Sequence, residues 1–291
     1  MEYRQGSDVF ALPPTPASTK SCLYRADAED DSQVSSRKSL VEDPYYRDNN
    51  LAENNIYMRS FYEEILVDIA GLVDHVRKDR DSPGVSPDQI GTGEPDVEGY
   101  FYAHVFPDPE PTDILQRTDR NSMAKHAVPD FGSKLKVSIP VPDILLGYNR
   151  NGAFSQQQPQ LRAMVNEMVA NTQGLVYPFF VIDMWVATNQ CLGGSASCVN
   201  IAERLNRQLR QCQNNKIRPV DSAAFSIAMN GTEARLYVSW KHDELKYYTR
   251  KVDSFLLQKP KDYTEFRKHV LNIIGAPERD SKIIGQPPRR E

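Results

Sequence analysis

The chain has 291 residues, of which 40% are hydrophobic and 25% charged, enough apolar material for one or two domains with a packed core. The absence of any run of about 18 apolar residues argues against a membrane span. The N-terminus lacks the basic and apolar regions of a secretory signal, and four cysteines in a chain of this length do not form a disulfide scaffold. We therefore expect an intracellular protein of the nucleus or cytoplasm.

The formal net charge of −4 is divided unevenly along the chain. Residues 1–130 carry 13 basic and 25 acidic side chains, whereas residues 131–291 carry 22 basic and 14 acidic ones. Such a split indicates different partners for the two halves, or halves that face each other. The basic C-terminal half is compatible with a nucleic-acid partner, and the acidic N-terminal half with a basic protein partner. No membrane partner is expected.

The first segment has the composition of a disordered tail. The stretches ALPPTPASTKS and ADAEDDSQVSSRKS are polar and offer almost nothing to bury. We expect a disordered tail over residues 1–46, one folded domain over 47–276 and a flexible C-terminal tail over 277–291. Within the domain, apolar residues recur with helical period between Leu51 and Arg80, which predicts one long helix there.

The middle of the chain alternates strand and helix patterns. Residues 100–106 fit either a short strand or the end of a helix. Residues 133–150 have strand chemistry with an irregular start marked by prolines. Residues 159–174 predict a helix, with Pro near its first turn and Gly at its end. Residues 175–182, LVYPFFVI, are continuously apolar and predict a strand buried on both faces.

The last third predicts a long helix, a hairpin and a closing helix. The helix spans residues 187–212, and Asn-Gly between two alternating runs predicts a hairpin over 223–240. Residues 245–258 are ambiguous between strand and helix, and residues 262–274 predict the closing helix. This order of elements, with one doubly buried strand, indicates an α/β or α+β fold.

Several familiar sites are unsupported. Cys191, Cys198 and Cys212 fall on one predicted helix, roughly 10 Å and 21 Å apart along its axis, so they cannot share one metal ion and indicate packed thiols. No H-x-x-x-H pair, nucleophile elbow or phosphate-binding loop is present. The Gly193-Gly194 pair indicates close packing or a kink in the helix.

One pair of acids is more informative. Asp143 lies at the start of a predicted strand, Asp183 follows the buried strand, and Gln190 lies on the helix after it. Two carboxylates at neighbouring strand ends can hold Mg²⁺, which prefers oxygen ligands and can activate water against a phosphate. The simpler interpretation is that Pro142-Asp143 is a common strand start and that Asp183 caps the helix.

The blocks NNIYMRSFYEEI, YPFFVI, WVATNQCLGGSASCVNIAERLNRQLRQC and DSAAFSIAMNGTEARLYVSWKHDEL resemble a fungal family of domains of unknown function. Through the order of elements and the acid pair, the chain is also similar to the PD-(D/E)XK nuclease superfamily. This resemblance implies a restriction-endonuclease-like central mixed sheet flanked by helices. It implies Asp143 and Asp183 as catalytic metal ligands, Glu63 as an additional acid on the first long helix, Gln190 lining the site, and Mg²⁺ as cofactor of a functional site.

The sequence departs from that pattern at the lysine. The superfamily motif is acid-x-Lys, but here the chain reads Asp183-Met184-Trp185. Trp cannot stabilise charge on phosphorus, and losing one preorganised charge partner lowers rates by roughly 10²–10³. We also suspect that a segment containing acid-x-Lys has been lost at this junction, because the strand runs into the helix with almost no turn residues.

The sequence therefore predicts a nuclease-like pseudoenzyme that binds nucleic acid. Two alternatives stay open: an active Mg²⁺-dependent nuclease in which another cation replaces the lysine, and a protein-interaction module with no nucleic-acid role. The basic residues predicted to contact phosphate are Lys134, Lys136, Arg150, Lys216 and Arg218.

Overall fold

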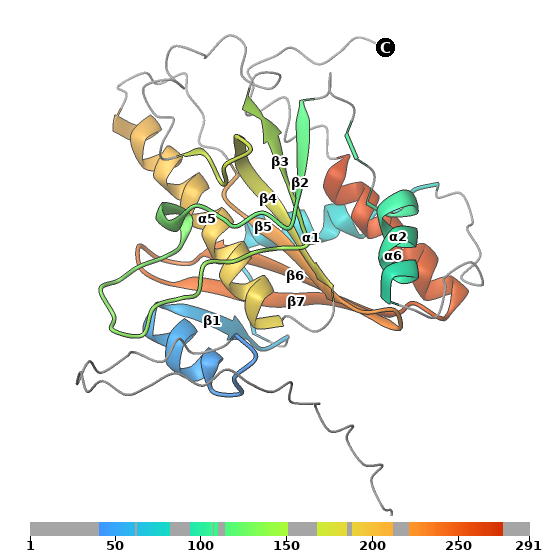
Figure 1. Ribbon diagram of the computed structural model, residues 1–291, viewed down its shortest axis with the longest axis horizontal. Coiled ribbons are helices and arrows are strands. Elements are labelled where there is room, and N and C mark those ends of the chain that lie inside the picture. Colours follow the sequence, from blue (N-terminus) through green and yellow to red (C-terminus); the bar gives the residue numbers. More distant parts are fainter. Residues whose placement is uncertain are drawn as a thin grey trace, which may run out of the picture. The chain divides into compact units, whose positions relative to one another are not determined.

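The computed structural model describes residues 41–61, 63–81, 94–106, 108–109, 114–150, 168–184, 188–211 and 221–275. These residues form a seven-stranded mixed sheet flanked by helices (Figure 1), which confirms the predicted α/β fold class. The strands are β1 (Ile56–Arg59), β2 (Leu115–Asp119), β3 (Ile144–Asn149), β4 (Leu175–Met184), β5 (Ala224–Met229), β6 (Glu233–Lys241) and β7 (Tyr247–Leu256). The helices are η1 (Arg47–Leu51), α1 (Val67–Val76), α2 (Glu94–His104), η3 (Lys125–Ala127), α5 (Thr188–Gln211) and α6 (Pro260–Ile274).

The strand order is β1-β7-β6-β5-β4-β3-β2. Strands β2, β3 and β4 pair antiparallel, as do β5, β6 and β7, while β4 runs parallel to β5 and β1 runs parallel to β7. The parallel pair β4 and β5 is connected through α5. Every residue of β4 is buried, as the continuous apolar run predicted. The predicted hairpin is β5 and β6, and the predicted closing helix is α6.

Helix α5 is enclosed on all sides after its first turn. Residues 191–202 are all buried, because the helix packs on β4, β5 and β6 and is crossed on its outer side by the segment between β2 and β3 (Figure 1). A Cβ on Gly194 would lie 3.1 Å from Cγ1 of Val181 on β4, and one on Gly193 would lie 3.5 Å from Cγ1 of Val137 on the crossing segment. The two glycines therefore serve close packing, as predicted.

Buried hydroxyl groups connect α5 to the sheet. The Ser195 hydroxyl donates to the carbonyl oxygen of Cys191 at 2.7 Å within the helix. The Ser239 hydroxyl on β6 donates to the Ser195 oxygen at 2.8 Å and lies 2.7 Å from the Thr249 hydroxyl on β7. This chain of hydrogen bonds satisfies polar groups that burial would otherwise leave without partners.

Aromatic side chains fill the contact between α2, α6 and β7. Phe266 on α6 packs against Phe255 of β7 and Phe101 of α2, and the Tyr100 and Tyr263 hydroxyls lie 3.0 Å apart. The stretch 100–106, which in the sequence fitted either a strand or a helix end, thus contains the end of α2 at His104. No helix in the described part of the chain is both long enough and apolar enough to span a membrane.

The long helix predicted from Leu51 to Arg80 is wrong. The chain leaves η1 at Asn54, whose side-chain amide donates to the carbonyl oxygens of Asn50 and Leu135, and Asn55 has a left-handed φ of 57°. The chain then forms β1 beside β7, and α1 covers only Val67–Val76. Local side-chain hydrogen bonds and a parallel strand partner outweigh the helical spacing of the apolar residues.

The structure also settles or limits several other predictions of helices, strands and boundaries. The ambiguous stretch 245–258 is strand β7 up to Leu256. The stretch 133–150 forms a strand only from Ile144. Most of the helix predicted over 159–174 lies outside the described residues. Tyr46, at the end of the expected tail, is buried in the core.

Candidate functional site

The two carboxylates of the predicted acid pair lie at adjoining ends of β3 and β4. The antiparallel register pairs Ile144 with Ile182, so the next step of the ladder places Asp143 opposite Asp183 on the same face of the sheet. The backbone N–H of Met184 donates to Oδ2 of Asp143 at 2.7 Å. Strand pairing thus brings together two acids that are distant in the sequence.

Asp183 is fully buried, and neither of its carboxylate oxygens has a hydrogen-bond partner among the described residues. Burial, together with the smaller effect of the Asp143 charge, raises its pKa to about 7, and the nearby Cys191 thiol and Gln190 amide oppose the shift. Burial therefore favours the protonated, uncharged form of the Asp183 carboxyl far more than water would. A buried acid without a partner is costly, and its cost calls for a functional explanation.

Asp143 is held by a cation that sequence reasoning missed. Nε of Arg120, the residue after β2, lies 3.4 Å from Oδ1 of Asp143. The same guanidinium donates to both carboxylate oxygens of Glu98 on α2, at 2.7 Å each. The side chains of Glu98 and Asp143 are 14% and 22% exposed, whereas that of Arg120 is 60% exposed. Both oxygens of Asp143 are therefore already engaged, one by Arg120 and one by the backbone of β4.

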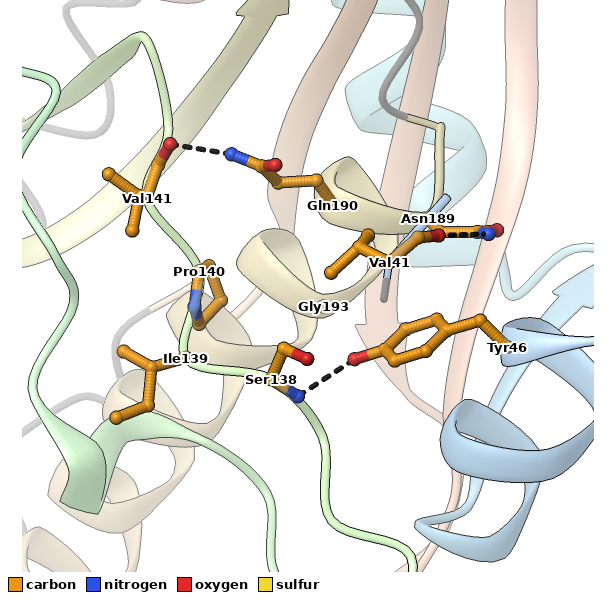
Figure 2. A pocket seen from close by; sticks show the side chains of 9 residues that line it. All are labelled: Val41, Tyr46, Ser138, Ile139, Pro140, Val141, Asn189, Gln190 and Gly193. Atoms are coloured by element: carbon orange, nitrogen blue, oxygen red, sulfur yellow. Dashed lines mark hydrogen bonds between the residues drawn. The ribbon is translucent and has the colours of Figure 1, made fainter. Parts of the chain in front are cut away.

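Gln190 lies beside the acid pair in the first turn of α5, as expected for a residue lining the site. Its amide donates to the carbonyl oxygen of Val141, two residues before Asp143, at 2.5 Å (Figure 2). A cavity of about 210 Å³ opens next to this contact. Its wall is formed by Val41, Tyr46, Ser138, Ile139, Pro140, Val141, Asn189, Gln190 and Gly193. On the opposite wall, the Tyr46 hydroxyl accepts a hydrogen bond from the Ser138 N–H at 2.7 Å.

The cysteine nearest the acids is unsuited to nucleophilic chemistry. The Cys191 thiol is buried and lies 3.2 Å from the carbonyl oxygen of Ile227, to which it donates. Burial, with the negative charge of Asp183, raises the pKa of the Cys191 thiol well above its usual range. The thiol therefore stays protonated. Cys198 is also buried and free, in agreement with the packed-thiol interpretation, and Cys212 lies outside the described residues.

Glu63 does not join this site. It was expected on a long helix, but it lies between β1 and α1 and forms an ion pair with Arg59. Strand β1 is the edge strand at the end of the sheet away from β3, and β7, β6 and β5 separate it from β4. The helical assignment of Glu63 is wrong because Asn54 and Asn55 end the preceding helical turn and a strand follows.

Three of the five residues predicted to contact phosphate lie in the described part of the chain. Lys134 and Lys136 are exposed on the segment that crosses α5, and Lys136 forms an ion pair with Asp130 at 2.6 Å. Arg150 immediately follows β3. Lys216 and Arg218 lie outside the described residues, as does Trp185, the residue in the lysine position.

Arg120 and Glu98 carried no sequence signal of their own. Arg120 contacts Asp143 because β2 pairs with β3, and residues 114–120 had no predicted strand. Glu98 reaches the site because the Arg120 side chain extends from the end of β2 to α2. No local sequence pattern predicts this contact.

The Mg²⁺ implied by the resemblance does not fit these residues. Among the described residues, no group of three or more His, Cys, Asp or Glu side chains is arranged to hold a metal ion. Mg²⁺ demands near-octahedral oxygen coordination, but Asp143 is engaged on both oxygens. Asp183 is sealed from solvent, and a guanidinium stands beside the pair.

The model of a family described as a domain of unknown function (DUF7924) matches residues 94–283. This range contains β2 to β7, α5, α6 and all the residues of the site except those on the Val41–Tyr46 wall of the cavity. The chain belongs to this family. No curated protein matches the chain.

Proposed function

We propose that this member of the DUF7924 family is a nuclease-like module that binds nucleic acid without cleaving it. The observation that carries the proposal is the arrangement of β3, β4, α5 and β5, with Asp143 and Asp183 at adjoining strand ends. An antiparallel pair bearing two acids, followed by a helix and a parallel strand, is similar to the PD-(D/E)XK arrangement on which the sequence resemblance rested.

Loss of cleavage is supported by three features. Trp185 replaces the motif lysine in the sequence. The nearest described cation, Arg120, is committed to Glu98 and Asp143. Asp183 is partly protonated near neutral pH, because burial raises its pKa to about 7. A site without a lysine, a suitable metal cradle or two ionised acids lacks the electrostatic stabilisation that phosphodiester cleavage needs.

Nucleic-acid binding is supported by charge. Residues 131–291 carry an excess of eight basic side chains over the 14 acidic ones. Lys134 and Lys136 are exposed on the segment that leads directly to Asp143. Neutralising backbone phosphates with such side chains releases counterions, so binding of this kind weakens steeply with salt.

The test is fluorescence anisotropy with labelled DNA and RNA, single-stranded and duplex, titrated with the full chain at low and moderate salt. We expect binding that weakens with salt and no shortened product in Mg²⁺ or Mn²⁺. Reversing Lys134 and Lys136 to Glu together should weaken binding about tenfold and reduce the salt slope by about two. The matched control reverses Lys259 and Lys261, exposed residues at the start of α6, and should change little. Absent or salt-insensitive binding contradicts the proposal.

A second candidate, a protein-interaction module, is favoured by one specific observation. Four large apolar side chains on the segment that crosses α5, Phe131, Leu135, Ile139 and Val141, are between 37% and 46% exposed. Two of them border the 210 Å³ cavity. A pull-down that survives nuclease treatment and is abolished by Ile139→Asp with Val141→Asp would favour this function over nucleic-acid binding.

A further inference from the structure

Arg120 is held in an unusual backbone conformation. Its φ is 51°, in the left-handed region that residues other than Gly, Asn and Asp rarely adopt. Its backbone N–H lies 3.1 Å from the carbonyl oxygens of both Pro142 and Asp143 and donates between them. The turn after β2 is therefore fastened to the residues that precede β3, and this fastening fixes where the Arg120 side chain begins.

From that position the guanidinium reaches two acids on different elements. It donates to both oxygens of Glu98 on α2 at 2.7 Å, and its Nε lies 3.4 Å from Oδ1 of Asp143. The paired geometry at Glu98 is the strong form of an arginine–carboxylate contact. The charge of Glu98 and its hydrogen bonds raise the pKa of Arg120 further, so the cation is permanent.

Behind Asp143 lies an acid that has no partner of its own. Asp183 is fully buried on the neighbouring strand, on the same face of the sheet, and neither oxygen has a hydrogen-bond partner within the described part of the chain. The Arg120 guanidinium therefore joins carboxylates from α2 and β3, and the carboxyl of Asp183 on β4 lies opposite the second of them. A divalent cation would be drawn to such a group of acids if no cation were already present.

We infer that Arg120 is a built-in counter-ion that stands where a divalent cation would otherwise bind, and that it excludes such a cation from the Asp143–Asp183 pair. The guanidinium neutralises Glu98 and Asp143 without the octahedral geometry that Mg²⁺ requires. The strained backbone is then part of the device, because it aims the side chain at the acids. This inference goes beyond the proposed function and does not depend on nucleic-acid binding.

The test is calorimetric titration of the full chain with Mn²⁺, in buffer without nucleic acid. Arg120→Gly removes the cation and suits the left-handed backbone, so the fold should be retained. We expect the wild-type chain to bind Mn²⁺ at least tenfold more weakly than Arg120→Gly. Adding Asp143→Asn to Arg120→Gly should abolish the gained binding, which would locate the ion at the acid pair.

Two further variants keep the test decisive. Arg120→Lys retains the charge and should behave like wild type. Arg120→Asn also tolerates a positive φ and replaces Arg120→Gly if the glycine variant does not give a native circular dichroism spectrum. The inference is overturned if wild type binds Mn²⁺ as tightly as the variants without the charge, or if removing the charge yields no binding. Either result leaves the nucleic-acid proposal to be judged by its own assay.

Discussion

The buried acid predicts an unusual dependence of stability on pH. The pKa of Asp183 rises from an ordinary value of 3.8 to about 7 in the folded protein. Between these values the folded state keeps a proton that the unfolded state has lost, so the free energy of unfolding falls as pH rises. Each pKa unit corresponds to 1.36 kcal/mol, so ionisable Asp183 costs about 4 kcal/mol above neutral pH. Below about pH 4 this cost is absent.

Asp183→Asn removes the ionisable group while keeping its shape. The amide introduces buried donors without partners, at a cost of roughly 1–3 kcal/mol at any pH. The variant should therefore be less stable than wild type at acid pH and more stable, by about 1–3 kcal/mol, above neutral pH. Between about pH 5 and pH 8 the stability difference should change by about 3 kcal/mol in favour of the variant.

Urea denaturation of both proteins at these two pH values measures the difference directly. Circular dichroism confirms that both are folded before urea is added. If the two stability curves run parallel with pH, Asp183 does not titrate as its burial requires. If the variant is the less stable protein at pH 8 as well, the carboxyl has stabilising partners in solution, and the reasoning fails.

Three further predictions concern packing and buried hydrogen bonds. Gly147→Ala should destabilise the fold by about 1–3 kcal/mol or more, because its Cβ would lie 2.9 Å from a backbone oxygen of β4. Gly71→Ala, at an exposed position on α1 with open space around it, should instead stabilise the fold by about 0.5–1 kcal/mol. Equal effects of the two variants on thermal unfolding would contradict this prediction. Ser239→Ala should cost about 1–3 kcal/mol in urea denaturation by breaking the hydroxyl chain between α5 and β7; an unchanged midpoint would show that the chain contributes nothing. Tyr46→Phe should cost about 1 kcal/mol by leaving the partly buried N–H of Ser138 without its acceptor, whereas Tyr45→Phe, 69% exposed, should cost nothing measurable.

Elements with a strong local signature were predictable from the sequence. Strand β4 is continuously apolar because both of its faces are buried, and the hairpin of β5 and β6 is marked by Asn230 and Gly231. There the Asn230 side chain accepts the backbone N–H groups of Thr232 and Glu233. Small residues in α5 indicated close packing, although not that a second layer of chain crosses the helix.

Features that depend on distant partners were not predictable. Strand β1 was read as helix because its apolar spacing suits both structures, and only pairing with β7 decides between them. The prediction for β7 was ambiguous for a local reason as well. The pairing register of β7 with β6 shifts between Leu236 and Tyr237, so buried and exposed residues do not strictly alternate along β7. Asp143 and Asp183 could be proposed as a pair from neighbouring strand ends. Arg120 could not, because its contact depends on how β2 pairs with β3.

The measurement that tests the account most directly is a single incubation of end-labelled nucleic acid with the wild-type chain and Mn²⁺, divided between a native and a denaturing gel. We predict a retarded complex on the native gel and an intact strand on the denaturing gel, because Trp185 replaces the motif lysine and Arg120 engages the Asp143 carboxylate. Shortened strands that disappear with Asp143→Asn would show an active nuclease, and a strand that is neither retarded nor cut would show that this domain does not act on nucleic acid.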